Sequence, residues 1–116
     1  MKVIHLGEAE RYEPENGWMR ASTCNERNIS VEYFIKPRGH ASPLHEHSQE
    51  QVCVVLKGKM RVKGVGGEES LLEPGDAAYF GAGEQHSIEN ALEEESIGID
   101  IFVPGRSFDF WLKRKV

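Results

Sequence analysis

Apolar residues between positions 29 and 103 come in short runs of four to eight positions, separated by segments rich in Gly, Pro and Asp. Several runs alternate apolar and polar side chains, which is the period-two pattern of a strand with one buried face. No stretch has the pattern of a long amphipathic helix; residues 107–115 are compatible with a short helical turn, and the alternative is an extended tail over residues 106–116. The pattern therefore indicates an all-β sandwich or barrel. The predicted strands cover residues 29–36, 51–57, 60–65, 68–72, 77–80, 87–90 and 96–103.

Size and charge narrow the classes of partner. The chain has 116 residues, 39% of them hydrophobic, which suits one domain with its own core. A formal net charge of −5 argues against a nucleic-acid backbone as partner. No run reaches the ~20 apolar residues of a membrane span, and the N-terminal segment lacks the apolar run of a signal peptide. We therefore expect a cytoplasmic protein that binds neither nucleic acid nor membrane.

Three histidines and a glutamine have the spacing of a metal site. His45 and His47 are two residues apart, Gln51 follows four residues after His47, and His86 lies in a later segment. On a continuous strand His45, His47 and Gln51 would share one face. Imidazole is the commonest side-chain ligand for first-row transition metals. We expect one divalent metal among Ni, Fe, Mn, Zn and Cu, between which the sequence does not choose.

Glu50 is the alternative to Gln51 as the fourth ligand. A carboxylate is ordinarily the stronger ligand for a dication, but strand alternation would point Glu50 to the opposite face. A bulge between Ser48 and Glu50 would reverse the two residues, so strand geometry favours Gln51 without excluding Glu50. A neutral amide would leave the ion its full positive charge, and a more electrophilic ion polarises bound oxygen more strongly.

The last apolar run contains a carboxylate. Asp100 and Phe102 share one face of residues 96–103, and the isoleucines of this run share the other. A carboxylate is costly to bury without a partner, so Asp100 either faces solvent at a strand edge or faces a polar cavity. We favour a barrel in which the isoleucines pack between the sheets while Asp100 and Phe102 face the histidines.

Arg106 follows Pro104 and Gly105 just beyond this run. It is either a solvated loop residue or a cation above the mouth of the barrel. A guanidinium in that place suits a substrate carboxylate, which it can bind through two parallel hydrogen bonds.

Two motifs in the chain resemble those of the cupin superfamily. The first cupin motif, with Gln in the place of Glu, is matched by Gly39, His45, His47, Gln51 and Gly58. The second, with Gly81 where proline is usual, is matched by Gly75, Gly81, Gly83, His86 and Asn90. The resemblance implies a cupin double-stranded β-helix, a jelly-roll barrel with a metal inside its mouth. It also implies a single cupin domain over residues 1–116, with the core barrel at about 29–103 between an N-terminal strand and a C-terminal tail.

A narrower resemblance concerns substrate. Residues 45–51, His-Glu-His-Ser-Gln-Glu-Gln, and residues 100–106, Asp-x-Phe-x-Pro-x-Arg, resemble the small cupins of the pectin-degradation family. Those proteins convert 4,5-unsaturated monouronates to a linear keto form, with a metal held by three histidines and a glutamine. The resemblance implies that His45, His47, Gln51 and His86 bind the metal here. It likewise implies functional roles for Asp100, Phe102 and Arg106.

These implications lead to a metal-dependent enzyme that linearises or isomerises a small unsaturated sugar acid. Asp100 would act as general acid and base, Arg106 would hold the carboxylate and Phe102 would pack against the ring. The alternatives are a metal-dependent dioxygenase and a non-catalytic sugar-binding module. Small cupins usually pair, so the resemblance also implies a homodimer that uses an N-terminal strand near residues 1–6. Trp18, Phe110 and Trp111 are candidate buried or interface aromatics.

Overall fold

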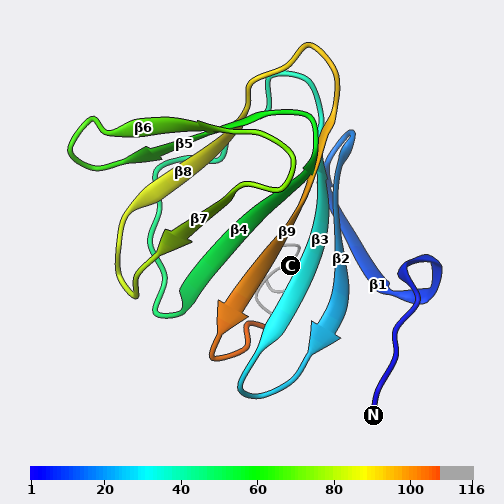
Figure 1. Ribbon diagram of the computed structural model, residues 1–116. Helices are drawn as coiled ribbons and strands as arrows, with labels where there is room; N and C mark the ends of the chain where they lie inside the picture. The colour runs from blue at the N-terminus through cyan, green and yellow to red at the C-terminus, as the bar shows by residue number, and fades with distance from the viewer. Residues whose placement is uncertain (108–116) are drawn as a thin grey trace.

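The computed structural model describes residues 1–107, and these form nine β-strands and one turn of 3-10 helix (Figure 1). The elements are η1 (Leu6–Glu8), β1 (Glu10–Glu15), β2 (Trp18–Asn25), β3 (Ser30–Lys36), β4 (Glu50–Lys57), β5 (Met60–Gly64), β6 (Glu69–Leu72), β7 (Ala77–Phe80), β8 (His86–Asn90) and β9 (Ser96–Val103). All seven predicted strands are present, each within one residue of its predicted ends, and the all-β prediction is confirmed. The helical turn considered for residues 107–115 falls almost entirely outside the described residues, as do Phe110 and Trp111.

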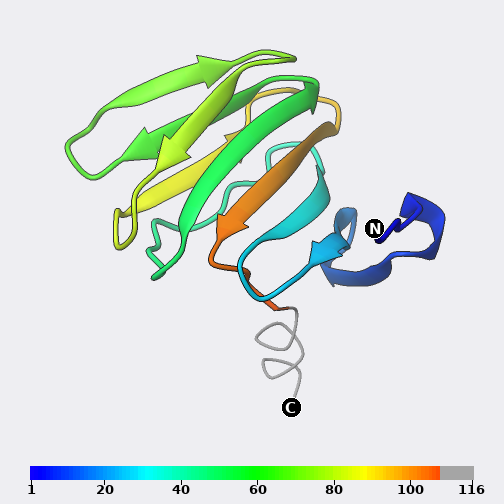
Figure 2. The same cartoon turned by 60° about the horizontal axis from the view of Figure 1, so that its bottom comes forward.

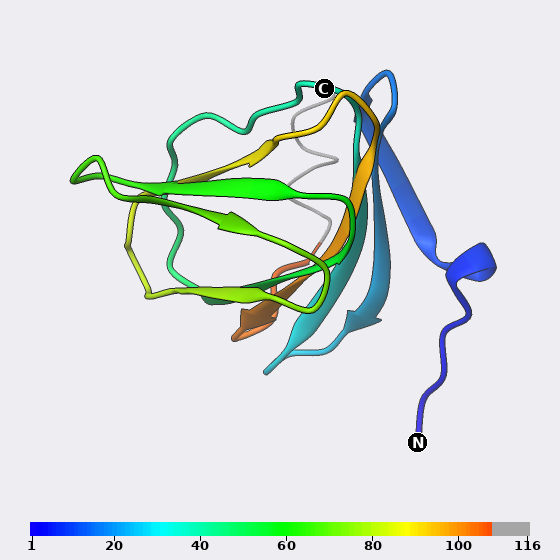
Figure 3. The same ribbon diagram turned by 45° about the horizontal axis from the view of Figure 1, so that its top comes forward.

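The strands form two antiparallel sheets. One has six strands in the order β1-β2-β3-β9-β4-β7, and the other has three in the order β6-β5-β8. Figure 3 shows the two sheets folded around a common interior. The chain crosses between them after β4 at Gly58, which has a φ of +88° and whose Cβ would lie 2.2 Å from the Ser96 hydroxyl. Only glycine suits both the left-handed backbone and this close approach.

The first two strands, β1 and β2, were missed because their sequences are polar. β1 includes Pro14 and alternates exposed with half-buried residues, as an edge strand does. Figures 1 and 2 place β1 at the edge of the larger sheet, away from β5, β6 and β8. Residues 1–5 form no strand, so the expected N-terminal strand near residues 1–6 is wrong. Their side chains are exposed, and none of the described strands pairs with them.

Apolar side chains from both sheets meet in one core. Phe34, Val55 and Met60 are fully buried there, and each contributes about 1.5–3 kcal/mol by leaving water. Gly98 allows this packing, since a Cβ at that position would lie 2.7 Å from the Phe34 ring. The remaining members of the core are Cys53, Val62, Leu72, Phe80 and Ile88.

The prediction for β9 is right for one face and wrong for the other: Asp100 and Phe102 face the cavity, but the isoleucines do not pack between the sheets. The isoleucines at 97, 99 and 101 are only half-buried and lie on the outer face, while Asp100 and Phe102 are buried inside. β3 follows the same rule, with Ser30, Glu32, Phe34 and Lys36 inward. Alternation shows which residues share a face but does not show which face is inside. Here part of the inner face is polar because it lines a cavity.

Candidate metal centre and cavity

The three histidines meet where the β3–β4 connection lies against β8. His45 and His86 exchange two backbone hydrogen bonds, of 3.0 and 2.9 Å. Gly83 donates its N–H to the His47 carbonyl at 2.8 Å. One ring nitrogen of each histidine lies within 4.8 Å of the others, so the cluster could hold a metal ion.

The prediction that His45, His47 and Gln51 share one face of a continuous strand is wrong. Residues 46–49 are not in a strand, and β4 begins only at Glu50. The histidines converge with Gln51 because the connection is tied to β8 and to the turn before it. The metal-site spacing therefore reflects a folded loop rather than one continuous strand.

Each imidazole has a defined orientation. The Nδ1 atoms of the three histidines lie 2.7, 2.9 and 2.9 Å from the backbone carbonyl oxygens of Pro43, Gln49 and Glu84, respectively. A carbonyl oxygen only accepts hydrogen bonds, so Nδ1 carries the proton and Nε2 keeps its lone pair. This backbone support is typical of histidine ligands in metal sites.

Burial favours the neutral rings that a metal requires. Loss of water around the rings lowers the pKa of His45 and of His86, although hydrogen bonds to the Pro43 and Glu84 carbonyls act in the opposite direction. Both rings therefore present a lone pair over a wider range of pH than an exposed histidine would.

Gln51, and not Glu50, lies with the histidines. Its Oε1 is 2.8 Å from His47 Nε2 and 3.1 Å from His86 Nε2. Its Nε2 donates to Asp100 Oδ1 at 2.9 Å, which turns the amide oxygen toward the rings. Glu50 is exposed and accepts a hydrogen bond from the Tyr79 hydroxyl.

The donor set fits a cation. Two imidazole lone pairs and an amide oxygen converge, and the Nδ1 bonds leave no proton between them. Three acceptors that face one another repel unless a positive charge lies among them. His45, His47, His86 and Gln51 would therefore hold a divalent ion, and nitrogen and oxygen donors suit a first-row transition metal.

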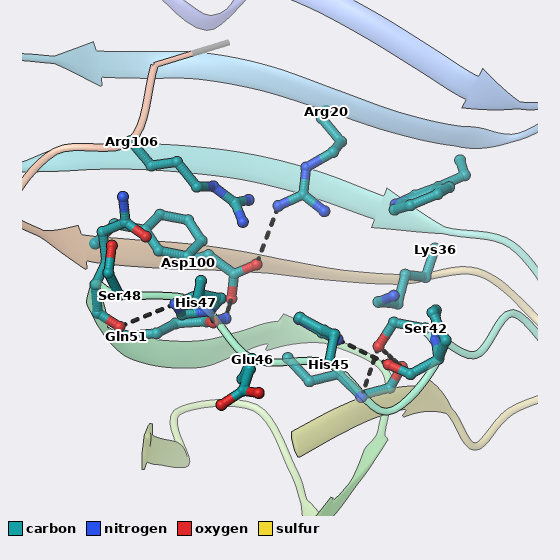
Figure 4. Close-up of a pocket in the computed structure, with 15 residues that line it drawn as sticks. Arg20, Lys36, Ser42, His45, Glu46, His47, Ser48, Gln51, Asp100 and Arg106 are labelled. Atoms are coloured by element: carbon teal, nitrogen blue, oxygen red, sulfur yellow. Dashed lines mark hydrogen bonds and ion pairs between the residues drawn. The ribbon is translucent and has the colours of Figure 1, made fainter. Parts of the chain in front are cut away.

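A cavity of about 400 Å³ opens beside these donors, which is within the size range of small-molecule sites. Figure 4 shows Gln51, His47 and Arg106 toward one end of the cavity and Lys36 and Ser42 toward the other. Asp100 lies between the two ends. Phe102 and Trp18 add aromatic wall. The structure thus brings all seven site residues predicted from sequence into one region.

Buried ion pairs connect the charged side chains around the cavity. Arg20 bonds through Nε to Glu32 at 2.7 Å and through Nη2 to Asp100 at 3.3 Å. Arg106 donates to the other oxygen of Glu32 at 2.9 Å and lies over the Phe102 ring, 3.9 Å from its centroid. Asp100 therefore bonds to Gln51 on one oxygen and to Arg20 on the other.

Sequence reasoning missed Arg20, Glu32 and Lys36, all of which are buried. Glu32 and Lys36 alternate with Phe34 in a predicted strand. That alternation was the available signal, because charged residues on the same face as a buried aromatic indicate a polar interior. Arg20 lies in β2, which was not predicted, and no local pattern identified it.

Comparison with known proteins agrees with this architecture. The structure is similar to that of KdgF from Halomonas sp., with a TM-score of 0.84 and 26% identity over 95% of this chain and 98% of that one. It has the same fold as an RmlC-like cupin from Shewanella frigidimarina NCIMB 400, with a TM-score of 0.83, 23% identity and coverage of 95% and 96% of the two chains. An uncharacterized protein of Streptomyces coelicolor is 27% identical over 107 residues, which cover 92% of this chain and all of that protein.

No helix among residues 1–107 is long and apolar enough to cross a membrane.

The family model described as the cupin domain matches residues 31–102, from β3 to the end of β9. That range contains both histidine segments, Asp100 and Phe102. The chain therefore belongs to the cupin family.

Proposed function

We propose that this protein is a metal-dependent enzyme that opens the ring of a small unsaturated uronate. The observation that carries the proposal is the position of Asp100, a buried carboxylate one hydrogen bond from the Gln51 amide in the cavity wall. A proton-transfer group therefore lies next to the metal donors. The likeness of residues 45–51 and 100–106 to the pectin-degradation cupins supports a uronate as substrate.

The reaction is an isomerisation, so no oxidant is needed. The proton of the anomeric hydroxyl leaves, the bond from C1 to the ring oxygen breaks, and C1 becomes an aldehyde. The ring oxygen keeps the bonding electrons as an enol oxygen on C5. A proton then adds to C4 and the enol becomes a ketone. A bound divalent metal supplies Lewis-acid stabilisation of negative charge on oxygen.

The side chains of the cavity would divide these tasks. Asp100 would accept the hydroxyl proton and return one to carbon, while its bond to Arg20 holds it in place. Phe102 would pack against the ring, and its own ring is fixed by the Arg106 guanidinium. A buried cation would hold the carboxylate, and Arg106 is the residue predicted for that role from sequence.

Incubation with 4,5-unsaturated galacturonate tests the proposal. The absorbance of the enol ether should disappear with wild-type protein and should stay after removal of the metal by a chelator. Asp100→Asn should lower kcat by about 10²–10⁴-fold, the usual contribution of a general acid or base. Unchanged activity of a folded, metal-loaded Asp100→Asn variant would refute the assigned role.

The same experiment separates the alternative functions. Oxygen uptake that depends on the metal would identify a dioxygenase instead. A panel of sugar acids that raises the melting temperature without turnover or oxygen uptake would identify a binding module.

A homodimer remains part of the proposal, with a different surface. The outer face of the larger sheet carries apolar rows across β3, β9 and β4, one of which joins Tyr33, Ile99 and Val54. These side chains are half-exposed, and apolar rows on an outer face are typical of protein contacts. Ile99→Lys should yield the monomer, and a wild-type mass near 13.1 kDa in sedimentation at micromolar concentration would refute dimerisation.

A further inference from the structure

Lys36 is a buried cation that the metal site does not use. The residue is 3% exposed, lies at the end of β3 and lines the cavity. Its Nζ lies 3.1 Å from His40 Nδ1. Within residues 1–107 no carboxylate oxygen comes within ion-pair distance of this ammonium, whereas Arg20 and Arg106 both form such pairs.

The partner of Lys36 does not neutralise its charge. Burial, with the nearby Lys36 and Arg20 charges, lowers the pKa of His40 to about 4, so the ring is neutral at pH 7. His40 therefore accepts a hydrogen bond at Nδ1, and its Nε2 lies 3.7 Å from the exposed Glu15 carboxylate. The remaining N–H groups of Lys36 have no hydrogen-bond acceptor among the described residues.

The largely buried charges around the cavity do not balance. Three cations, Arg20, Lys36 and Arg106, face two buried carboxylates, Glu32 and Asp100. Glu46 also lines the cavity, but it is exposed to solvent. The two arginines pair with both carboxylates, which leaves the excess positive charge at Lys36. A buried charge without a counter-ion costs several kcal/mol, so this site favours an anion from outside the chain.

The surroundings of Lys36 resemble a ligand subsite. Its Nζ lies 5.3 Å from the centroid of the Trp18 ring, and the His40 ring is tilted by 39° against the same ring, with the centroids 4.3 Å apart. Ser42 lines the cavity toward the same end in Figure 4. An aromatic wall, a cation and a hydroxyl together suit a carboxylated sugar.

We infer that Lys36 binds the carboxylate of the ligand, at the end of the cavity away from Gln51. The inference rests on the proposed function only for the identity of the ligand as a uronate. It replaces Arg106 as the carboxylate site, because Arg106 already pairs with Glu32 and covers Phe102. The uronate would then extend from Lys36 toward Asp100 and the metal donors.

The inference includes a pH dependence. Burial, reinforced by Arg20, lowers the pKa of Lys36 to about 8, while Asp100, Cys53 and Glu15 act in the opposite direction. The neutral His40 adds no charge. A carboxylate needs the protonated ammonium, so binding should be constant well below pH 8 and weaken, by up to about tenfold per pH unit, above the free-protein pKa of about 8.

Fluorescence of Trp18 tests the inference without turnover. The chain has two tryptophans, so Trp111→Phe leaves Trp18 as the single reporter. Galacturonate, which has no enol ether and cannot react, is titrated into this protein and into Lys36→Met, Lys36→Arg and Arg106→Met versions. Galactose, which lacks the carboxylate, is the neutral control.

Lys36→Met should raise the galacturonate Kd by about 10-fold to 100-fold, as expected for loss of a charge-assisted hydrogen bond. Lys36→Arg and Arg106→Met should change it less, and galactose should bind every version alike. The pH profile of the Trp111→Phe protein gives the same test without a change at Lys36.

Four outcomes would overturn the inference: no galacturonate binding, equal binding by Lys36→Met, a larger loss in Arg106→Met, or a flat profile through pH 10. Uronate binding that depends on Lys36 but leads to no turnover of the unsaturated sugar would refute the proposed function and leave this inference standing.

Discussion

The two ends of the cavity are built in different ways. At the Gln51 end, protein groups orient the metal donors: backbone carbonyls orient the imidazoles, and Asp100 orients the amide. At the other end, Lys36 has one neutral partner and no counter-ion within the described chain. Donors that are oriented by protein hydrogen bonds suit a permanently bound ion. A buried charge without a counter-ion suits a ligand that binds reversibly.

The largest expected difference between variants at the two ends is in their metal content. His86→Ala should lower metal affinity by more than about 100-fold, since loss of even an outer-shell partner costs about 10–100-fold. Elemental analysis after dialysis measures this. Lys36→Met is the matched control and should keep its metal. Equal metal content in wild type and His86→Ala would exclude the assigned ligand set.

Stability should respond in opposite directions to the loss of a paired and of an unpaired cation. Arg20→Met removes the partner of both Glu32 and Asp100 and should destabilise the fold by about 3–5 kcal/mol. Urea denaturation of the metal-free protein measures the change. A loss below about 1 kcal/mol would mean that the two carboxylates find compensation elsewhere.

Lys36→Met should instead stabilise the metal-free protein, and the gain should depend on pH. The folded state lowers the pKa of Lys36 from 10.5 to about 8, which at 1.36 kcal/mol per pH unit corresponds to about 3 kcal/mol. Above pH 8 the folded protein has already released this proton while the unfolded chain still holds it. Wild-type stability should therefore rise, relative to the variant, between pH 8 and 10.5.

Urea denaturation of both proteins at pH 7 and pH 10 checks this sign. The gain from Lys36→Met should be near its maximum at pH 7 and small at pH 10. A gain that does not change with pH would show that Lys36 keeps an ordinary pKa in the folded state.

The two ends also differ in how far the sequence predicted them. His45, His47, Gln51 and His86 lie in two short segments, so their spacing alone indicated a metal site. The reason given for their convergence was wrong, because the hydrogen bonds that hold the His45 segment to β8 join residues about forty positions apart. Spacing along the sequence indicates which residues belong to one site. It does not indicate the long-range hydrogen bonds that bring those residues together.

Lys36 could not be recognised from sequence for a related reason. A lysine at the end of a strand usually reaches solvent, and only the packing of β2, Trp18 and His40 around it removes the water. The predicted inward packing of the β9 isoleucines was wrong for a similar reason. Apolar alternation is equally compatible with a face that packs in the core and with an outer face that forms contacts. The seven strands were predicted because short apolar runs, bounded by turn residues, are a local signal.

Steady-state kinetics of two variants on 4,5-unsaturated galacturonate test the division between the two ends most directly. Asp100→Asn should lower kcat by at least about 100-fold with little change in KM. Lys36→Met should raise KM by about 10-fold or more with little change in kcat, because it removes a charge that binds the substrate and leaves the proton-transfer group Asp100 in place. Absence of wild-type turnover, or an equal loss of kcat in both variants with KM unchanged, would contradict the account.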